Sequence, residues 1–544
     1  MDADVVVIGG GLAGSMASVM LERRGLRTVV LESRPFGKEQ KVVVGEALTE
    51  GTSVFVRHEI GLTDWLKKNA FRKFGFDFVT LPRDREAPAS ADDCHELLLS
   101  LTPFEKMPGA FPFLIPTYHV ERTSMNAHVA EMARSEGARY VYGASVENVE
   151  LGASPAAGHT VRYAHEGEVR ELRCRWVLDC SGRRAVLGRQ LGITHPVKEL
   201  DTAAVWNRFS NVNADRDYWK TFKGVDRRRH TIHYTGAGFW IWWIHQNDNL
   251  TSVGVSYDKK QHQPNVKSDD HGFWEMLKKH PPAYEALKGA TALEPYQYYA
   301  HLPYTSEHFI GKQGYTLVGD AAWFVDALYS VGIETACRQL VHAVPLIVDA
   351  CRGQGACGKT IDKLNMEFGY TQRAVVKLNA FKYHHGWARP NVVMQTALYE
   401  LGEIAELYHL QDKSRWKPEV LAKHYRLQWS SEARLRKLER FMETALAEDG
   451  ERDLEDPTLL RKALLPGKIV YAATWPLWKL PHARPYFFII TRAWGYSERF
   501  AQRTKLWPDA LRWMTGGGPF ASLVARLNRP PADGKEMDAA QKAS

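Results

Sequence analysis

The sequence predicts an α/β fold in which two β-sheet domains are interleaved and a helical domain follows. Three observations predict it. A glycine-rich turn separates an apolar run from a helical stretch near residue 9, and later turns follow apolar runs near residues 179 and 319. Beyond residue 351, apolar residues take helical spacing, which predicts helices at 362–379, 391–408 and 430–447. The 544 residues are 44% hydrophobic and 25% charged, which excludes a disordered, collagenous or coiled-coil chain. Such a length corresponds to roughly three or four domain-sized units.

The N-terminal turn has the pattern of a dinucleotide-binding fingerprint. Apolar residues 5–8 precede Gly9, Gly11 and Gly14 in a G-x-G-x-x-G arrangement, a helical stretch follows, and Glu32 ends the next apolar run. The first glycine permits the tight turn, the second lets the backbone approach a pyrophosphate, and the third lets helix and strand pack closely. The helix N-terminus attracts phosphate, and Glu32 can accept hydrogen bonds from a ribose. A Rossmann-like module is therefore predicted.

Two later turns favour FAD over NAD as the ligand of this module. Residues 179–182 (DCSG) and 319–322 (GDAA) each follow an apolar strand. A carboxylate beside a helix N-terminus at such a strand end can bind a ribityl chain and a pyrophosphate. A separate NAD(P)H-binding domain is not evident, so we expect a separate flavin reductase to supply reduced flavin.

Residues 1–350 resemble the flavin-dependent halogenases, a family of the FAD-dependent aromatic-hydroxylase-like superfamily. The most specific segment is residues 238–245 (GFWIWWIH), which is similar to the W-x-W-x-I-P motif of that family and puts Trp240 and Trp242 on one face of a strand. Lys73 matches the family's lysine. The resemblance is closest to the branch that acts on phenols and pyrroles, and Tyr329 stands where tryptophan halogenases carry a glutamate.

The resemblance implies a two-component halogenase that uses FADH2 and O2 to place chloride or bromide on an electron-rich aromatic substrate, free or tethered to an acyl or peptidyl carrier protein. In the family scheme a flavin C4a-hydroperoxide oxidises halide to hypohalous acid, which Lys73 holds beside the substrate. Trp240 and Trp242 screen flavin from substrate, with core packing as the alternative role. Backbone N–H groups of Ser330, Val331 and Gly332 are the candidate halide site. The implied cofactor-binding residues are Gly9, Gly11, Ala13, Gly14, Glu32, Ser33, Gly45, Arg122, Asp179, Gly182, Gly319, Asp320, Gly332 and Ile333.

Three residues depart from the family pattern. Glu50 stands in a segment where relatives have Ser-Leu-x-Pro, and His245 and Ala327 replace prolines. Loss of proline reshapes a loop without removing a reacting group, whereas His245 adds a titratable group near the predicted site. These departures favour one alternative, a flavin monooxygenase or oxidase on the same scaffold. The apolar and aromatic residues 464–496 favour a second, an isoprenoid-chain reductase. A non-catalytic flavin-binding or carrier-docking protein is the third alternative, and no feature of the sequence favours it.

Composition also bears on partners and location. The net charge of +8 includes no long basic run, so no nucleic-acid partner is expected, and six cysteines without a Cys-x-x-Cys pair predict no metal site. The apolar run at residue 5 leaves no room for a cleavable signal, which predicts a cytoplasmic protein. Residues 464–496 mix aromatic, proline and basic residues, and predict either a cap over the site or a peripheral membrane contact.

The predicted domain boundaries follow from these patterns. An FAD-binding domain is expected in residues 1–80, 112–195 and 300–350, a substrate-side β-sheet domain in 81–111 and 196–299, a helical cap in 351–528 and a disordered tail in 529–544.

Overall fold

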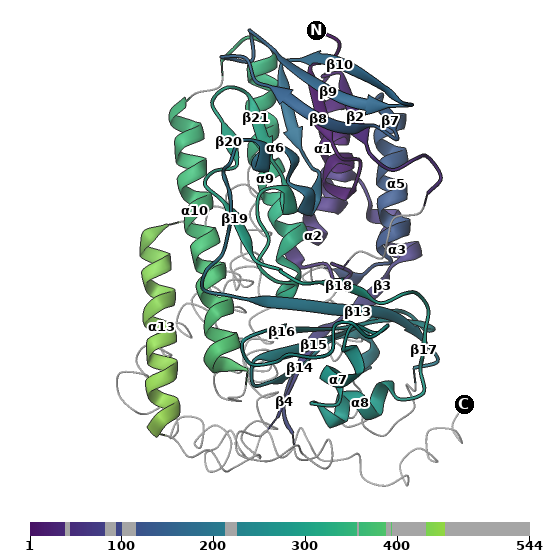
Figure 1. The fold of residues 1–544 in the computed structure, drawn as a ribbon, viewed down its shortest axis with the longest axis vertical. Helices are drawn as coiled ribbons and strands as arrows, with labels where there is room; N and C mark the ends of the chain where they lie inside the picture. The colour runs from purple at the N-terminus through teal and green to yellow at the C-terminus, as the bar shows by residue number, and fades with distance from the viewer. Residues whose placement is uncertain are drawn as a thin grey trace, which may run out of the picture. The chain divides into compact units, whose positions relative to one another are not determined.

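Two β-sheets organise the computed structural model (Figure 1). The structure describes residues 1–38, 44–81, 94–100, 116–212, 226–355, 358–387, 393 and 431–451, all of which belong to one unit, Met1–Pro457. The predicted segment 464–496 and the predicted tail 529–544 lie outside the described residues.

The first sheet is the predicted nucleotide-binding sheet. Its strand order is β20-β21-β11-β1-β2-β7, and every neighbouring pair is parallel except β20 with β21. The strands on either side of the glycine-rich turn are buried on both faces, which explains their continuous apolar runs. Helix α1 packs against α5 and α9. The elements are β1 (Val5–Ile8), α1 (Leu12–Glu22), β2 (Thr28–Glu32), α5 (Arg122–Ser135), β7 (Arg139–Tyr142), β11 (Trp176–Asp179), β20 (Ile310–Gly311), β21 (Tyr315–Leu317) and α9 (Val331–Cys351).

The second, larger sheet has the order β17-β13-β16-β15-β14-β4-β5, with β18 paired to β13. Strand β4 pairs with β14 and β5, so the predicted boundary at residue 80 shifts toward the N-terminus of β4. Helices α7 (Phe273–Leu277) and α8 (Pro281–Leu287) cover one face of this sheet, where Ile241 and Trp243 join their core. The strands are β4 (Gly75–Thr80), β5 (His95–Ser100), β13 (Thr202–Ser210), β14 (His230–Gly236), β15 (Phe239–Asn247), β16 (Leu250–Asp258), β17 (Thr291–Ala292) and β18 (Gln297–Tyr299).

Smaller elements complete the frame around the two sheets. Strands β3 (Phe71–Lys73) and β6 (Thr117–His119) form a short antiparallel pair, and β12 (Thr194–Pro196) pairs with β19 (Tyr304–Ser306). An antiparallel sheet in the order β10-β9-β8 also belongs to the fold. Its strands are β8 (Ser145–Glu150), β9 (His159–His165) and β10 (Glu168–Cys174), and the remaining helices of the N-terminal half are α2 (Glu50–Phe55), α3 (Thr63–Asn69) and α6 (Val186–Gln190).

The C-terminal part of the described chain is helical, as predicted. Helix α10 (Gly358–Phe381) and helix α13 (Glu432–Glu451) run side by side (Figure 1) and share an apolar contact that includes Leu378 and Leu438. These helices confirm the ones predicted at 362–379 and 430–447, whereas the one predicted at 391–408 lies outside the described residues apart from residue 393. None of the helices within the described ranges has the length and apolar character needed to span a bilayer.

Two further features bear on cofactor and redox chemistry. Gly353, Gly355 and Gly358 repeat the G-x-G-x-x-G spacing, but they follow helix α9 rather than a strand and therefore lack the context of a nucleotide-binding turn. None of the cysteines that the structure describes forms a disulfide bond, and all of them are buried: Cys94, Cys174, Cys180, Cys337 and Cys351.

Candidate active site

The glycine-rich turn has the geometry that a pyrophosphate requires. Gly9 adopts a φ of +97°, and a Cβ at Gly14 would lie 2.0 Å from the Gly9 carbonyl oxygen, so the helix can approach the strand only without a side chain there. A Cβ at Gly11 would meet nothing within 4 Å among the described residues. The N-terminus of α1 therefore faces open space, which fits a bound phosphate group.

Glu32 lies at the carboxyl end of β2, beside this turn. Its Oε2 accepts a hydrogen bond from the N–H of Gly10 at 2.8 Å, and Arg34 Nε lies 2.9 Å from Oε1. Burial alone would raise the pKa of this carboxyl, but the bonds from Arg34 and Gly10 outweigh burial and lower it. The adjacent Ser33 Oγ accepts a hydrogen bond from Arg184 at 3.0 Å. Ribose binding by Glu32 stays a prediction.

The Asp179 carboxylate is hydrogen-bonded to the turn that follows β11. Its Oδ1 accepts a hydrogen bond from the N–H of Ser181 at 2.9 Å, and its Oδ2 accepts one from the N–H of Leu187 at 2.8 Å. The side chain is fully buried, and the two bonds hold the turn and the start of α6. Asp179 therefore holds the backbone of this turn, and its contact with the cofactor stays a prediction. Gly182, with a φ of +62° and nothing within 4 Å of an added Cβ among the described residues, remains open to a ligand.

The loop after β21 brings the remaining predicted cofactor residues together. A Cβ on Gly45 would lie 2.6 Å from Arg122 Nη1 and 3.4 Å from Ile333 Cδ1, and one on Gly332 would lie 3.4 Å from Asp320 Oδ1. Arg122 Nη1 also donates to the Val44 carbonyl at 2.8 Å. These contacts join segments far apart in the sequence into one surface.

The polar groups of this surface fit FAD. Desolvation raises the pKa of Asp320, although the guanidinium groups of Arg183 and Arg122 oppose the increase. Arg122 Nε is buried and, within the described part of the chain, has no hydrogen-bond partner. Gly319, whose φ is +61°, would place an added Cβ 4.0 Å from Ala13 Cβ on helix α1, so this loop adjoins the glycine-rich turn. A polar ligand that spans both turns would satisfy these groups.

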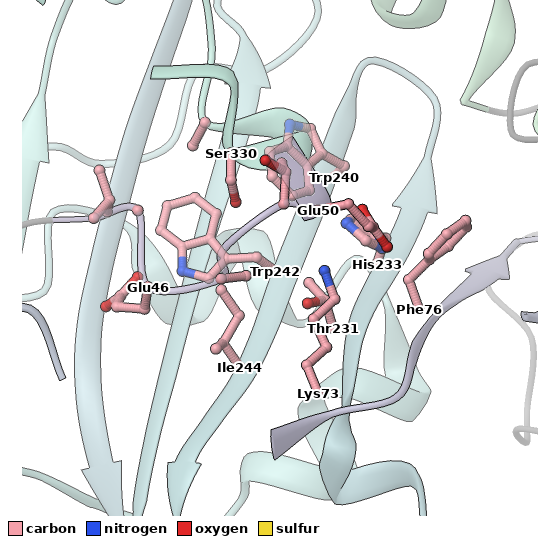
Figure 2. Close-up of a pocket in the computed structure, with 15 residues that line it drawn as sticks. Glu46, Glu50, Lys73, Phe76, Thr231, His233, Trp240, Trp242, Ile244 and Ser330 are labelled. Atoms are coloured by element: carbon pink, nitrogen blue, oxygen red, sulfur yellow. The ribbon is translucent and has the colours of Figure 1, made fainter. Parts of the chain in front are cut away.

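A pocket lies on the face of the larger sheet opposite α7 and α8 (Figure 2). Strand β15 gives it Trp240, Trp242 and Ile244, which confirms that the two tryptophans share a face. Lys73 at the end of β3 lines the same pocket, although it lies far from the tryptophans in the sequence. The other lining residues are Val44, Gly45, Glu46, Ala47, Thr49, Glu50, Phe76, Thr231, His233, Ala327 and Ser330.

Lys73 and Glu50 form the charged part of this pocket. Desolvation lowers the pKa of Lys73, and the Glu50 carboxylate partly restores it. Desolvation likewise raises the pKa of Glu50, against the effect of Lys73. Among the described residues, the Lys73 ammonium makes no direct hydrogen bond, so its Nζ is available to a ligand in the pocket. The departure at Glu50 thus places a carboxylate opposite Lys73.

Two further pocket residues were not predicted as site residues from the sequence. His233 Nδ1 donates to the Asp77 carbonyl at 3.1 Å, its ring stacks on Phe78 at 4.6 Å, and burial lowers its pKa to about 3. Glu46 is buried, and its Oε1 accepts a hydrogen bond from Gln246 Nε2 at 3.0 Å. Glu46 belongs to the Gly-Glu segment of the family, which was the available signal; His233 is separated from Lys73 by 160 positions and has no motif.

The expectation that His245 adds a titratable group to the site is wrong. Its side chain lies on the opposite face of β15, where Trp243 Nε1 donates to His245 Nε2 at 3.2 Å and His245 Nδ1 bonds Thr251 Oγ1 at 2.9 Å. Burial lowers its pKa to about 4, so the ring is neutral at pH 7. The His245 carbonyl accepts a hydrogen bond from His119 Nδ1 at 2.8 Å. The His245 side chain is therefore not among the residues that line the pocket.

The predicted halide site lies at the N-terminus of α9. Ser330 lines the pocket and has a φ of 56°, but its N–H donates to the Ala327 carbonyl at 3.2 Å. Val331 and Gly332 are in the first helical turn, where N–H groups have no carbonyl partner within the helix. The N–H groups of Val331 and Gly332 are therefore the candidate donors to a halide, and that of Ser330 is not.

Comparisons with known proteins agree with this geometry. The model of the FAD binding domain family matches residues 2–360. A 1H-pyrrole-2-carbonyl-(peptidyl-carrier protein) chlorinase of Pseudomonas fluorescens is 30% identical over 361 residues, which cover 64% of this chain and 77% of the relative. A corresponding brominase of Pseudoalteromonas luteoviolacea is 25% identical over 358 residues, 64% of this chain and 78% of the relative. The crystal structure of halogenase PltM with phloroglucinol and FAD has a TM-score of 0.68 at 18% identity, covering 86% of this chain and 97% of that one.

The fold and the cofactor surface define an FAD-dependent oxidoreductase. Within that class, the chain belongs to the flavin-dependent halogenase family.

Proposed function

We propose that this protein chlorinates or brominates an electron-rich phenol or pyrrole, and that Lys73 delivers the halogen. The observation that carries the proposal is that Lys73, Trp240 and Trp242 line one pocket. This pocket adjoins the loop between β21 and α9, residues 318–330, which we call the cofactor loop. Relatives named for action on pyrrolyl groups of a peptidyl-carrier protein support a carrier-tethered substrate.

The surface formed by the glycine-rich turn and the loop after β21 would hold FAD, which when reduced and supplied with O2 would provide the oxidising power that turns halide into hypohalous acid. The N–H groups of Val331 and Gly332 hold the halide at the positive end of α9. The Trp240 and Trp242 rings exclude water and substrate from the cofactor side of the pocket. Lys73 Nζ then holds the hypohalous acid beside the aromatic ring, since a desolvated amine of lowered pKa is a better nucleophile than an exposed ammonium.

Two partners follow from this proposal. The cofactor must arrive reduced, so a separate flavin reductase is part of the system. A carrier protein presents the substrate if the acyl group is tethered. The predicted membrane contact through residues 464–496 lies outside the described residues and adds nothing to the proposal.

The experiment supplies the full-length protein with FAD, a flavin reductase, NADH, O2 and bromide. A panel of phenols and of free and carrier-bound pyrrole-2-carboxylate is screened by high-resolution mass spectrometry. The matched variants are Lys73→Ala and Lys68→Ala, the second being an exposed lysine on helix α3. We expect a brominated product that Lys73→Ala loses and Lys68→Ala keeps, while both bind FAD. An oxygenated or dehydrogenated product that is indifferent to bromide and to Lys73 would move the enzyme to the monooxygenase or oxidase class.

A further inference from the structure

The indole N–H of Trp240 belongs to a cluster of buried, hydrogen-bonded polar groups behind the pocket. Trp240 Nε1 donates to Asp326 Oδ1 at 3.1 Å and to the Tyr383 hydroxyl oxygen at 3.0 Å. The Tyr383 hydroxyl donates to Asp326 Oδ2 at 2.7 Å, and Ser256 Oγ donates to the same oxygen at 2.9 Å. The N–H of Leu328 completes the set on Oδ1 at 3.0 Å. The Asp326 carboxylate thus accepts hydrogen bonds from Trp240 and from three groups close to it.

The burial of this cluster argues that the arrangement is specific. Trp240 and Tyr383 are each 1% exposed, Asp326 is 2% exposed and Ser256 is fully buried. Buried polar groups are costly unless their bonds are satisfied, and a satisfied network holds its members in one geometry. Burial raises the pKa of Asp326, whereas the bonds from Tyr383, Leu328, Ser256 and Trp240 lower it. Tyr383, whose pKa burial raises well above its usual value, remains a neutral donor.

The members of the cluster come from three separate parts of the chain. Trp240 and Ser256 are neighbours on β15 and β16, and Asp326 is in the loop between β21 and α9, which carries the predicted cofactor residues. Tyr383 lies in the π-helical turn Lys382–Gly386 after α10, beyond residues 2–360 that match the FAD-binding family. The cluster therefore ties the cofactor loop, the pocket wall and the C-terminal helical part together at Trp240.

The contacts of the Trp240 ring with other aromatic rings are all tilted. Its centroid lies 5.6 Å from that of Trp242, 5.8 Å from that of His233 and 6.4 Å from that of Trp387, all at tilted angles rather than close stacking. Such contacts are weakly directional, so the hydrogen bonds at Nε1 are what select one ring orientation.

We propose that Tyr383 and Asp326 are positioning residues that lock the Trp240 ring as the wall between the cofactor loop and the pocket, and that the C-terminal helical part thereby controls how efficiently oxidant reaches the substrate. This inference rests on the proposed function for its effect on halogenation. The first part of the proposal, that Tyr383 orients the Trp240 ring, does not depend on the proposed function and is tested separately.

The structural test is 19F NMR of the full-length protein labelled with 5-fluorotryptophan. The Trp240 resonance is assigned by its loss in Trp240→Phe and compared in the wild type, Tyr383→Phe and the matched control Tyr257→Phe. Tyr257 is a buried tyrosine next to Ser256 on β16, and its side chain points to the opposite face of the sheet. We expect Tyr383→Phe to shift and broaden the Trp240 resonance and Tyr257→Phe to leave it in place. An unmoved Trp240 resonance in Tyr383→Phe would overturn the proposal.

The functional test measures halogenated product and hydrogen peroxide formed per reduced FAD. We expect Tyr383→Phe to lower the ratio of product to peroxide about fivefold, the change that follows from loss of one ordinary hydrogen bond, with FAD affinity unchanged. Ser256→Ala removes one donor to Asp326 and the 2.6 Å contact of Ser256 Oγ with the Tyr383 hydroxyl, but it leaves both hydrogen-bond partners of Trp240 Nε1 in place. It should therefore lower the ratio less, and it serves if Tyr383→Phe does not fold. An unchanged ratio in both variants would overturn the role in coupling. If the wild type halogenates nothing, the proposed function fails, while the NMR result still decides whether Tyr383 orients Trp240.

Discussion

Gly254→Ala is expected to displace Trp242, because the tryptophan occupies the space that a side chain at residue 254 would need. A Cβ at this position would lie 2.1 Å from Trp242 Cζ2, 2.4 Å from Trp242 Cη2 and 2.5 Å from Trp206 Cβ. Ordinary carbon contacts are about 3.5–4.0 Å, so the indole must move by roughly 1 Å or more. Both tryptophans are buried, and overpacking of a dense interior costs about 1–3 kcal/mol.

The assay compares the midpoint of thermal unfolding and the halogenation rate of Gly254→Ala with those of the wild type. The matched control is Gly358→Ala at the start of α10, where an added Cβ meets nothing within 4 Å among the described residues. The control should be neutral or slightly stabilising, because alanine favours helix over glycine. We expect Gly254→Ala to unfold at lower temperature and to halogenate poorly, since Trp242 forms part of the pocket wall. A variant with the unfolding temperature and rate of the wild type would refute the claim that Trp242 fills the space beside Gly254 and that its displacement is costly.

Three further predictions concern buried charges. Lys73→Met should raise the free energy of unfolding at pH 7, because it removes a desolvated ammonium. The pKa of Lys73 is lower in the folded than in the unfolded protein, so the stability of the wild type rises as the pH increases between those two pKa values. Urea unfolding should therefore show a smaller difference in unfolding free energy between variant and wild type at pH 10 than at pH 7. Glu50→Gln removes the carboxylate that raises the pKa of Lys73, so the acid limb of the halogenation pH profile should move to lower pH, and an unmoved limb would contradict the pairing. Asp77→Asn breaks a fully buried pair in which Arg227 Nε lies 2.8 Å from Asp77 Oδ2, and it should cost about 3–5 kcal/mol of unfolding free energy at pH 7. Burial raises the pKa of Asp77, but His230 and Arg227 outweigh burial and lower it. The stability of the wild type should therefore fall below about pH 4, as this carboxyl takes up a proton, and the variant should lack this loss. Equal loss of stability in acid for variant and wild type would contradict the lowered pKa of Asp77.

Features that depend on neighbouring residues could be predicted from the sequence. The glycine spacing around Gly9, Gly11 and Gly14 is short-range, and the structure builds the strand, turn and helix that it predicts. Alternation along a strand placed Trp240 and Trp242 on one face for the same reason. The position of Lys73 in the pocket depended on the family resemblance, because its local context is simply a cluster of basic residues.

Features that depend on distant pairing or on side-chain direction could not be predicted in the same way. The spacing of the turn after β11 does not predict the direction of the Asp179 side chain, whose two carboxylate oxygens each accept a hydrogen bond from a backbone N–H group. Alternation did contain the signal for His245, because His245 is two positions from Trp243 and so shares its face of β15, which is turned away from the pocket. Tyr383 reaches Trp240 across 143 positions and Asp326 across 57, and no motif marks Tyr383.

The buried cysteines have a consequence for an enzyme that generates a strong oxidant. Burial raises the pKa of Cys174 and of Cys351 to about 12, and it raises those of Cys180 and Cys337 well above the usual value. The thiolate is the form that oxidants attack, so these side chains stay in the less reactive protonated state at pH 7 and are shielded from solvent. Hypohalous acid that escapes capture would meet few sensitive sulfur atoms in the described part of the chain, of which the exposed Met366 is one. In the described part of the chain, a surface methionine rather than a cysteine is therefore the sulfur-containing side chain that leaked hypohalous acid would reach first.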